Sequence, residues 1–492
     1  MHITLLSSII EKLLKKHLEE EKRYKVITIF LLFYLLLVGL SPSILRGVLF
    51  YILFTGNKVY YFYIKKENLF ITVLSIALLI NPNYIYDIGF KYSYLISFSL
   101  LKCSNILEDK SKIKSLLKVS LLSFFVSSPI TLNNFYQLNL LSIIYNILFV
   151  PYVSTILFPF TLIVFIFRPL EGVYNLLIYI LEESSLAFSK INFSKLVFKK
   201  LPLIVYIIYF FIVILYIYTK NKRIIIVYLI IILIHLLIPY FDNTVYLESI
   251  DVGQGDSILI HNKTHNILID TGGLRNDYDH NLFYNTISPT LKIKGINKLD
   301  YLILSHGDYD HLGETINIIN NIKVDKVIFN TGEYNYLEKE IIKELNKKKI
   351  KYYQDIEVLN WHKTYIYFLN TKEYDNENEN SNVLYLELNN YKILLMGDAG
   401  VIKEKDILKE YELESIDILK AGHHGSNTSS SKEFINYINP KYTIISVGEN
   451  NKYGHPNKEV LENLKDSNIY RTDQLGSIMF RIDKKIIIER SR

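Results

Sequence analysis

Four potential metal ligands lie within six residues in the second half of this 492-residue chain, namely His306, Asp308, Asp310 and His311. They directly follow an apolar run, Tyr301–Leu304, that is typical of a buried strand. A turn after such a strand can aim His306, Asp308 and Asp310 toward one point, and His311 adds a second direction. The spacing therefore predicts a site for a divalent cation.

Two further groups of ligand type follow later apolar runs. Asp398 comes after Leu394–Met396, and the pair His423-His424 follows Leu419–Ala421, with glycine beside each group. Taken singly, either group is better explained as surface residues or helix caps in a polar turn. The recurrence of all three groups in this order favours a shared site, where loops at one edge of a sheet hold two ions about 3.5–4 Å apart. Such ions activate water and stabilise the leaving oxygen of a phosphodiester.

The elements that must position these side chains are short β-rich runs, which begin after Thr244 and are separated by glycine, asparagine and aspartate. Mixed strands and helices of this kind predict a layered sheet sandwich with helices outside. The predicted strands are Val245–Ile250, Asp256–His261, Asn266–Asp270, Tyr301–Ser305, Val324–Phe329, Ser381–Leu388, Tyr391–Met396, Tyr442–Val447 and Lys485–Glu489. The predicted helices are Leu337–Lys348 and Ser431–Ile438.

The two halves of the chain differ in charge and in apolar content. Residues 1–240 carry 24 Lys and Arg against 11 Asp and Glu, whereas residues 241–492 carry 31 against 38. Nine of the twelve histidines also follow residue 241. We therefore expect a membrane domain over 1–241 and a hydrolase domain over 242–492. The single cysteine, Cys103, excludes an intramolecular disulfide framework and a cysteine-based zinc site.

The first half contains apolar windows that approach the roughly 20 residues needed to cross a bilayer. We expect about six to eight spans in a polytopic α-helical domain. One window, Leu140–Phe167, is too long for a simple span and contains Pro151 and Pro159, so it is either kinked or divided by a broken turn. The clearer windows are Val26–Leu40, Val119–Leu132, Leu140–Phe167, Leu203–Tyr218 and Ile224–Phe241, and the weaker ones are Gly47–Ile64, Leu69–Ile80 and Tyr92–Leu101.

The basic excess of the first half has two interpretations. Lys and Arg cluster in short loops such as Lys110–Lys118 and Lys220–Arg223, as the positive-inside rule predicts for cytoplasmic loops. Alternatively, some of these cations contact a polyanion such as DNA, whose phosphates dominate its affinity for proteins.

With these residues in view, the chain from Val245 to Arg492 resembles the metallo-β-lactamase domain of the ComEC family of DNA internalisation channels. That resemblance implies an α/β fold of the αββα sandwich type. The matching stretches are Leu247–Ser257, Leu268–Gly273, Ser305–Gly313, Leu394–Ala399, Lys420–Ser429, Ser446–Pro456 and Tyr470–Ser477.

The first half resembles the competence domain of the same family at Gly39–Arg46, at Asn81–Phe90 and around Asn146–Pro159. Members of the family carry earlier membrane segments, an OB-like domain and a Ser-Gly-x-His stretch before this point. The present sequence opens on Met1-His2-Ile3. The resemblance therefore leads us to expect that the front part is missing, through a misplaced start, a split gene or a degraded gene.

Carried over residue by residue, the resemblance implies roles for the site residues. The implied metal ligands are His306, Asp308, Asp310, His311, Asp398 and one of His423 or His424. Catalysis is expected to depend on Asp310, His311 and Asp398. Asp251, Asp256 and Asp270 either support the ligands by hydrogen bonds or form turns beside Gly253, Gly255 and Gly272. Lys420, Ser426 and His455 are candidates for supporting the ligands or meeting substrate phosphate, with a structural role as the alternative for Lys420 and His455.

The implied donor set is rich in oxygen. Aspartate at position 308 replaces a histidine of many metallo-β-lactamase relatives, and a later histidine ligand is absent near Asn380-Ser381. Because harder ligands shift preference from zinc toward manganese or magnesium, we expect two divalent ions with Mn²⁺ favoured over Zn²⁺ or Mg²⁺.

The resemblance implies DNA uptake during natural transformation. The membrane domain would pass single-stranded DNA through the plasma membrane, and an extracellular hydrolase domain would cut the strand that does not enter. Expected partners are single-stranded DNA, the lipid bilayer, a competence DNA receptor, a cytoplasmic ATPase and an upstream OB-domain fragment. Two alternatives remain open: a membrane-tethered phosphodiesterase with no transport role, and a truncated remnant that does not transport.

Overall fold

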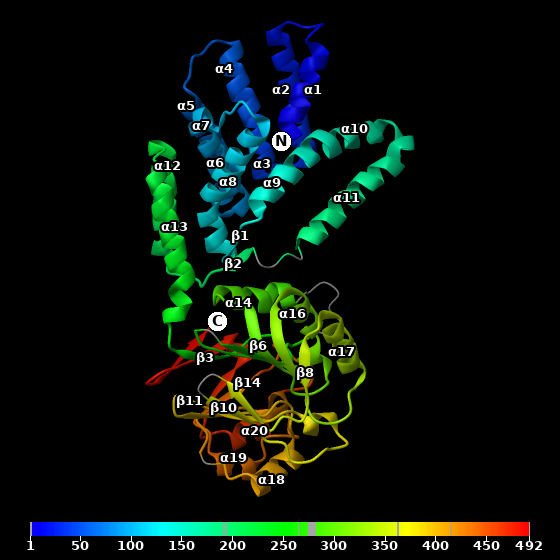
Figure 1. Cartoon of the computed structure of the whole chain (residues 1–492), viewed down its shortest axis with the longest axis vertical. Helices are drawn as coiled ribbons and strands as arrows, with labels where there is room; N and C mark the ends of the chain where they lie inside the picture. Colours follow the sequence, from blue (N-terminus) through cyan, green and yellow to red (C-terminus); the bar gives the residue numbers. More distant parts are fainter. Residues whose placement is uncertain are drawn as a thin grey trace. The chain divides into compact units, whose positions relative to one another are not determined.

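The computed structural model describes residues 2–189, 191, 194–263, 265–273, 282–361, 364–413 and 415–491. The chain divides into two compact units, Met1–Ile234 and His235–Arg492. The boundary expected at Phe241 from charge and hydropathy falls just inside the second unit, at the end of a short helical turn, Ile238–Phe241. The two units are described separately (Figure 1).

The first unit is helical, with one small two-stranded ribbon between β1 (Gln137–Asn139) and β2 (Lys195–Val197). Its core is built from apolar side chains of the first helices, including Ile27, Leu31 and Val73. The helices are α1 (His2–Leu14), α2 (Glu20–Val38), α3 (Pro42–Phe50), α4 (Gly56–Val59), α5 (Lys66–Ile80), α6 (Ile88–Lys102), α7 (Ser104–Leu107), α8 (Lys112–Phe135), α9 (Ser142–Pro151), α10 (Phe158–Ile166), α11 (Glu171–Ser189), α12 (Leu203–Thr219) and α13 (Lys222–Leu237).

Three helical runs in the described chain are long and apolar enough to cross a bilayer: Lys112–Phe135, Ser142–Ile166 and Lys222–Phe241. A fourth apolar helix, α12, is shorter. The sequence predicts more spans, and the difference lies in how its apolar windows fold. The window Gly47–Ile64, for example, is helical only as far as Val59, where the run of α3, a π-helical turn and α4 ends.

The run Ser142–Ile166 is helical throughout, because a π-helical segment, Tyr152–Leu157, joins α9 to α10. Pro151 ends α9 and Pro159 lies in the first turn of α10, where a missing backbone N–H is tolerated. Figure 1 shows α9 and α10 as one long curved helix. Of the two possibilities left by the sequence, a break between two segments is therefore wrong.

The second unit contains two sheets packed face to face. The eight-stranded sheet has the order β17-β16-β3-β4-β5-β6-β7-β8, and the seven-stranded sheet has the order β15-β14-β13-β12-β11-β10-β9. Their strands are β3 (Val245–Ser249), β4 (Ile258–His261), β5 (Asn266–Ile269), β6 (Lys298–Ile303), β7 (Lys323–Ile328), β8 (Lys351–Tyr353), β9 (Val358–Trp361), β10 (Thr364–Phe368), β11 (Leu384–Leu388), β12 (Tyr391–Leu395), β13 (Ile418–Lys420), β14 (Tyr442–Ile445), β15 (Asn468–Arg471), β16 (Ile478–Ile482) and β17 (Ile486–Arg490).

Helices cover the outer face of each sheet, as Figure 1 shows for α14, α16 and α17 on one side and α18, α19 and α20 on the other. One apolar cluster fills the space between the sheets, and two more lie between a sheet and its helices. This is an αββα sandwich, so the predicted fold class is confirmed. The helices are α14 (Ser288–Ile293), α15 (Tyr309–Leu312), α16 (Thr315–Asn321), α17 (Tyr336–Lys348), α18 (Val401–Glu410), α19 (Lys432–Ile438), α20 (Lys458–Asn463) and α21 (Thr472–Leu475).

Two predicted strands extend too far into neighbouring loops. Asp256–His261 is a strand only from Ile258, and Ser381–Leu388 only from Leu384. The reason lies in the backbone hydrogen bonds of the excess residues. Asp256 N donates to Asp310 O, and Asn382 N donates to Ser305 O, so these residues hold loops together and do not pair in a sheet.

Candidate metal centre

The site residues follow the carboxyl ends of parallel strands in both sheets. In the first sheet β5, β6 and β7 are parallel, and in the second β12, β13 and β14 are parallel. Asp270 follows β5, His306 follows β6, Asp398 follows β12 and His423 follows β13. Loops at the carboxyl ends of parallel strands are where α/β folds bind ligands, and here the two sheets bring their loops to one centre.

Two glycines, Gly255 and Gly273, allow the segment that carries Asp310 and His311 to pack closely against the loops that precede β4 and follow β5. A Cβ on Gly255, whose φ is +132°, would lie 2.2 Å from Asp310 O, and one on Gly273 would lie 2.2 Å from Tyr309 O. Thr271 N also donates to His311 O at 2.7 Å. The glycine-rich stretches on either side of β4 and β5 therefore hold the backbone of the Asp310-His311 segment in place.

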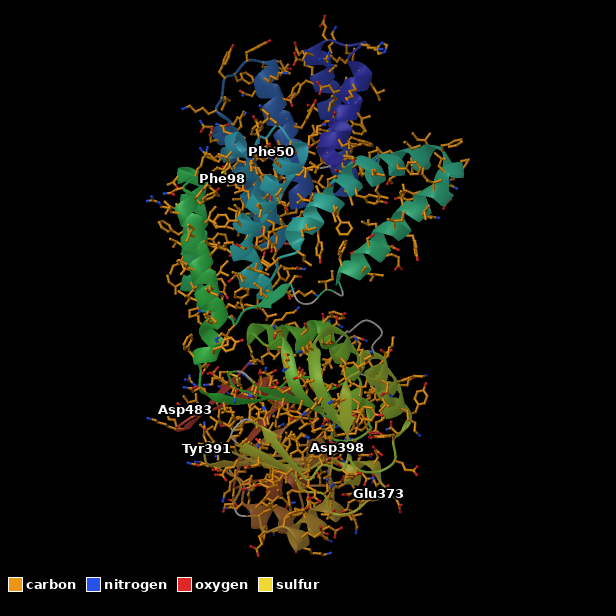
Figure 2. All side chains as sticks on the ribbon, viewed as in Figure 1. Phe50, Phe98, Glu373, Tyr391, Asp398 and Asp483 are labelled. Carbon is orange, nitrogen blue, oxygen red and sulfur yellow. The ribbon has the colours of Figure 1, made fainter. Side chains whose placement is uncertain are left out.

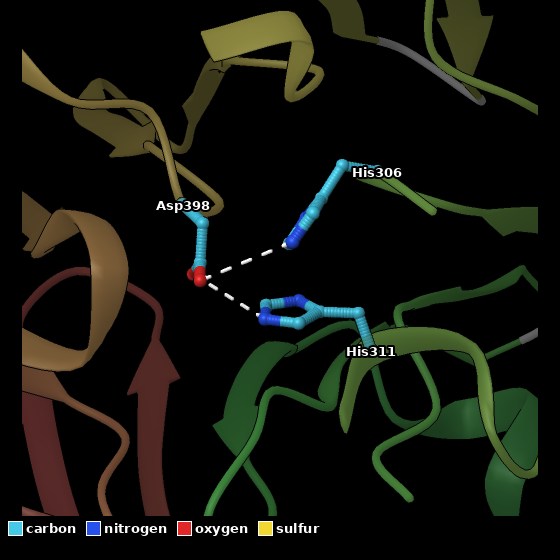
Figure 3. A group of neighbouring side chains, drawn as sticks. All are labelled: His306, His311 and Asp398. Carbon is cyan, nitrogen blue, oxygen red and sulfur yellow. Dashed lines mark ion pairs between the residues drawn. The ribbon is translucent and has the colours of Figure 1, made fainter. Parts of the chain in front are cut away.

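Asp398 is the centre of the site. Its carboxylate is buried, with Oδ1 3.3 Å from His311 Nε2 and Oδ2 3.9 Å from His306 Nε2 (Figure 3). Its Oδ2 is also 3.5 Å from His424 Nε2. These separations are longer than hydrogen bonds. Three imidazoles and one carboxylate thus surround a common point without bonding directly to one another.

The donor atoms of this centre lack other partners. Within the part of the chain that the structure describes, His306 Nε2, His311 Nε2, His424 Nε2 and Asp398 Oδ1 are buried and accept or donate no hydrogen bond. Buried polar atoms without partners are costly and rare. Two overlapping groups are placed to hold an ion, His306 with His311 and Asp398, and Asp310 with His311 and His424, and they share His311. The residues present therefore fit divalent metal ions.

The two adjacent histidines differ in their surroundings. His424 is 2% exposed, its Nδ1 lies 2.9 Å from Ser446 O, and its Nε2 lies 3.4 Å from Asp310 Oδ2. His423 is partly exposed, with Nδ1 3.0 Å from Thr428 Oγ1 and Nε2 3.8 Å from Asp398 Oδ2. Both have positive φ, a conformation that is uncommon outside glycine and often marks functional sites. The geometry directs His424 into the centre and leaves His423 at its rim.

Asp308 and Asp310 also differ. Asp310 belongs to the group around His424, and the imidazoles of His424 and His311 outweigh burial and lower its pKa to about 2. Asp308 has a side chain that is 54% exposed, and its Oδ2 lies 3.6 Å from His306 Nε2. Contact with His306 lowers the pKa of Asp308 as well. Asp308 thus lies beside the centre, at its open side.

A second layer of side chains orients the ligands. Asp270 Oδ2 lies 2.8 Å from His311 Nδ1 and accepts from Ser305 Oγ at 2.6 Å. Ser305 Oγ in turn lies 3.0 Å from His306 Nδ1. Because a hydrogen bond at one imidazole nitrogen fixes the ring and exposes the other nitrogen, Asp270 and Ser305 hold both Nε2 atoms toward Asp398.

Asp256 and Lys420 form a buried ion pair in the same layer. Lys420 Nζ also donates to Gly397 O at 3.1 Å, beside Asp398, and is fully buried. Asp256 Oδ1 lies 3.7 Å from His424 Nδ1. Buried in this way, Lys420 supports the loop that carries Asp398 and has no open face toward a substrate.

The remaining predicted residues lie at or beyond the edge of the centre. Asp251 Oδ1 accepts from Gly253 N at 3.2 Å, which is a turn. Ser426 Oγ accepts from Thr428 N at 3.3 Å. The His455 ring lies 5.8 Å from that of His423 and has a buried Nδ1 with no hydrogen-bond partner among the described residues.

Two residues that the sequence did not single out hold the His306 loop, and a third lies beside His423. Glu377 Oε1 accepts from Gly307 N at 2.7 Å, and Asn335 Nδ2 donates to Gly307 O at 2.7 Å. Asn378 Nδ2 lies 3.5 Å from His423 Nε2. Glu377 and Asn378 belong to a segment rich in Asn and Glu, Asp375–Asn382, whose composition is typical of an ordinary loop. No local sequence signal marks them.

The charged groups of the centre shift one another's pKa values. Burial acts to lower the pKa of His311, but the carboxylates of Asp398 and Asp270 outweigh it and hold that pKa well above its ordinary value. Burial opposes ionisation of Asp398, yet His424 and His311 hold its pKa well below the usual range. The carboxylate is anionic at neutral pH. Because metal ligation requires neutral histidine, a bound cation takes the place of the protons that these imidazoles otherwise keep.

Comparisons with known proteins agree with this geometry. Residues 1–223 match the competence protein family, and residues 250–449 match the metallo-beta-lactamase superfamily. ComE operon protein 3 of Bacillus subtilis is 26% identical over 99% of this chain and 67% of its own length. Competence protein ComA of Neisseria gonorrhoeae is 30% identical over 48% of this chain and 32% of its own. Recombination protein 2 of Haemophilus influenzae is 30% identical over 44% and 26%.

The fold, the site and these matches define the class: a membrane protein that joins a competence domain to the fold of metal-dependent hydrolases. More narrowly, the chain belongs to the ComEC family of competence proteins, and the resemblance seen in its motifs is confirmed. The chain spans about two thirds of the Bacillus relative and between a quarter and a third of the other two.

Proposed function

We propose that this protein takes part in DNA uptake, with the helical unit passing one DNA strand across the cell membrane and the sandwich unit hydrolysing the other. The observation that carries this proposal is the set of four unpartnered donor atoms around Asp398, in a chain whose other half matches competence proteins. The helical unit would carry out the passage of one strand, and the centre that fits metal ions would carry out hydrolysis of the other.

In the proposed reaction the chain's residues supply a rigid, charged cradle. His306 and His311 would hold one divalent ion, Asp310 and His424 would hold a second, and the Asp398 carboxylate could contribute to either. Two such ions supply charge that activates water and stabilises the departing oxygen of a phosphodiester. Asp270 and Ser305 keep the imidazoles oriented, so little reorganisation is needed when substrate arrives.

We further propose that the preferred ion is Mn²⁺. Asp310 and Asp398 supply carboxylate oxygens, and Asp308 at the open side offers another beside His306. A donor set that mixes several carboxylates with imidazole favours harder ions than a set made of histidine alone. Zn²⁺ and Mg²⁺ are the alternatives that metal analysis distinguishes.

Cutting the strand that stays outside requires the sandwich unit to face the cell exterior, and we propose that orientation. A competence DNA receptor, a cytoplasmic ATPase and an OB-domain fragment are the proposed partners, by analogy with the family. A cysteine placed at exposed Tyr453 and tested with a membrane-impermeant maleimide reports the orientation, with labelling of intact cells expected. Labelling only after lysis would reverse the assignment.

The hydrolysis itself is tested with full-length protein in nanodiscs and a labelled single-stranded oligonucleotide. We expect cleavage that depends on Mn²⁺ and is lost in Asp398→Ala. Uptake is tested separately, by transformation of cells that lack the gene. Hydrolysis with unaltered uptake would favour a tethered phosphodiesterase, and inactivity with Mn²⁺, Mg²⁺ and Zn²⁺ would favour a remnant.

A further inference from the structure

A cavity in the helical unit contains an arginine without a carboxylate partner. The cavity has a volume of about 460 Å³ and is lined by α1, α3 and the π-helical turn that follows α3 (Tyr51–Thr55). Arg46 of α3 contributes to its wall. This residue ends the Gly39–Arg46 motif, which resembles the competence domain and is not part of the hydrolase site. Phe50, labelled in Figure 2, lies on the same helix.

The Arg46 side chain is held in place by neutral groups. Its guanidinium carbon lies 5.6 Å from the centre of the Phe50 ring, and one terminal nitrogen donates to Ser97 Oγ on α6. Its Nε is buried and has no hydrogen-bond partner among the described residues. No carboxylate in the described chain forms an ion pair with it. The positive charge is therefore positioned but not neutralised.

An unneutralised cation in an apolar setting is costly unless an anion completes it. Guanidinium groups present a planar fork of N–H donors that matches the oxygens of a phosphate. Thr4, Ser7 and Ser43 line the same cavity; Thr4 and Ser43 offer hydroxyl groups for further phosphate oxygens, while Ser7 Oγ donates to Thr4 O at 3.0 Å. Its size suits a phosphate with part of a sugar. The chemistry that fits is that of a phosphodiester.

Aromatic rings beside this arginine favour a nucleic-acid strand. Phe50, Tyr51 and Phe54 line the cavity, and the Phe50 and Phe54 rings are stacked with centroids 4.8 Å apart. Single-stranded nucleic acids bind where cations track the phosphates and aromatic faces accept the bases. A lipid headgroup would use the arginine but has no base to stack on these rings.

We propose that Arg46 and this cavity bind a backbone phosphate of the single DNA strand that the helical unit passes. This inference rests on the proposed function. It assigns Arg46 the phosphate, Ser43 a supporting hydroxyl, Phe50 the task of holding the guanidinium and Phe54 that of facing a base.

The test uses full-length protein in nanodiscs, with EDTA present so that the strand is not cut, and a fluorescein-labelled oligothymidine followed by anisotropy. Arg46→Gln is expected to weaken binding roughly 10- to 100-fold. Its log–log salt slope should fall by about 0.7, the value for one phosphate contact on a single strand. Arg46→Lys keeps the charge but loses the planar set of N–H donors, so its affinity is expected to lie between those of the wild type and Arg46→Gln. The control is Arg168→Gln, at an exposed position, which should bind like wild type.

Each other outcome is decisive. Equal affinity and equal salt slope in Arg46→Gln and Arg168→Gln would overturn the assignment. Loss of a co-purified phospholipid from Arg46→Gln, with DNA binding unchanged, would assign the cavity to a lipid instead. If Arg46→Gln does not fold, Arg46→Lys and Ser43→Ala replace it, and wild-type affinity in both would overturn the proposal. Absence of DNA binding by the wild-type protein would contradict the proposed function itself.

Discussion

The two units bury polar groups in opposite ways. In the described part of residues 2–234 the buried polar side chains other than tyrosine are all serines. Two of them, Ser99 and Ser128, donate to carbonyls of their own helices. The sandwich unit buries many ionisable groups instead, including Asp270, His311 and Asp398. Buried charge is tolerated where partners or a bound ion offset the free-energy cost of its desolvation. The contrast teaches that buried charge is concentrated in the sandwich unit, whereas Arg46 in the helical unit is half-buried, with only its Nε fully shielded.

The largest expected effect comes from removing the central charge. Asp398→Asn keeps the shape of the side chain but removes the anion that His306, His311 and His424 surround. We expect hydrolysis to fall by more than about 100-fold, beyond the range for outer-layer residues, together with loss of bound metal. Oligonucleotide cleavage and elemental analysis measure the two.

Asp466→Asn, at an exposed position of the sandwich unit, is the control for that change. Wild-type metal content and rate in Asp398→Asn would contradict the account. An equal loss in Asp466→Asn would show that the effect is not specific to Asp398.

Asp270→Asn tests whether the second layer acts through the ligands. Asp270 orients His311 through Nδ1 and also holds Ser305. The expected loss of metal affinity or activity is about 10–100-fold, smaller than that of Asp398→Asn. Titration of the metal-free protein with Mn²⁺ measures the affinity. An unchanged affinity would mean that the loop alone fixes His311.

A buried carboxyl at the start of α17, beside the loop that carries His306, links stability to pH. Burial raises the pKa of Glu338 to about 7, although the Asn335 backbone N–H opposes this. The folded protein then keeps a proton that the unfolded chain has released, so the unfolding free energy is highest below about pH 4.5 and falls as pH rises to about 7. Between pH 4.5 and pH 8 the unfolding free energy of the wild-type protein should fall by roughly 2 kcal/mol, after allowance for partial solvent screening. Glu338→Gln cannot ionise and should not show this fall.

Chemical denaturation at pH 5 and pH 8 measures this difference, and exposed Glu340→Gln on the same helix is the control. If Glu338→Gln shifts stability equally at both pH values, the carboxyl is not protonated in the folded protein near neutrality.

The smallest effect is expected in the helical unit. Tyr228 OH of α13 and Ser128 Oγ of α8 lie 2.5 Å apart, and the Tyr228 ring packs on Phe125 at 4.8 Å. Hydrogen bonds between membrane helices average about 0.6 kcal/mol, so Tyr228→Phe should lower the unfolding free energy by about that amount. Unfolding in mixed micelles measures it, with exposed Tyr179→Phe as the control. A loss of several kcal/mol would show that this unit, too, depends on single polar contacts.

The sequence predicts the sandwich fold and the residues nearest its centre because each group of ligands follows an apolar strand and lies near a glycine. His306, Asp310 and Asp398 carry that signal in their immediate neighbours. Glu377 and Asn335 do not, because they act through hydrogen bonds to the backbone of Gly307, far away in the sequence. The choice between His423 and His424 also depends on backbone turns that adjacent identical residues cannot reveal.

Strand ends and helix lengths were predicted less well for a related reason. Asp256 and Asn382 have the pattern of strand residues, yet their backbone groups bond to site loops. The edge strands β8 and β9 are short, and no strong alternation marks them. In the helical unit an apolar window predicts burial in lipid but not where a helix ends, since the window Gly47–Ile64 extends beyond the helical run that ends at Val59.

The most direct test of the central claim is metal-dependent hydrolysis of single-stranded DNA by the full-length protein, compared with Asp310→Ala. Asp310 contacts His424 and contributes to one of the two ligand groups without the structural bonds that Asp270 makes. The account predicts Mn²⁺-dependent cleavage by wild type, with near-complete loss of cleavage and of about one bound ion in Asp310→Ala. Equal cleavage by the two proteins, or none by wild type with any of the three metals, would contradict it.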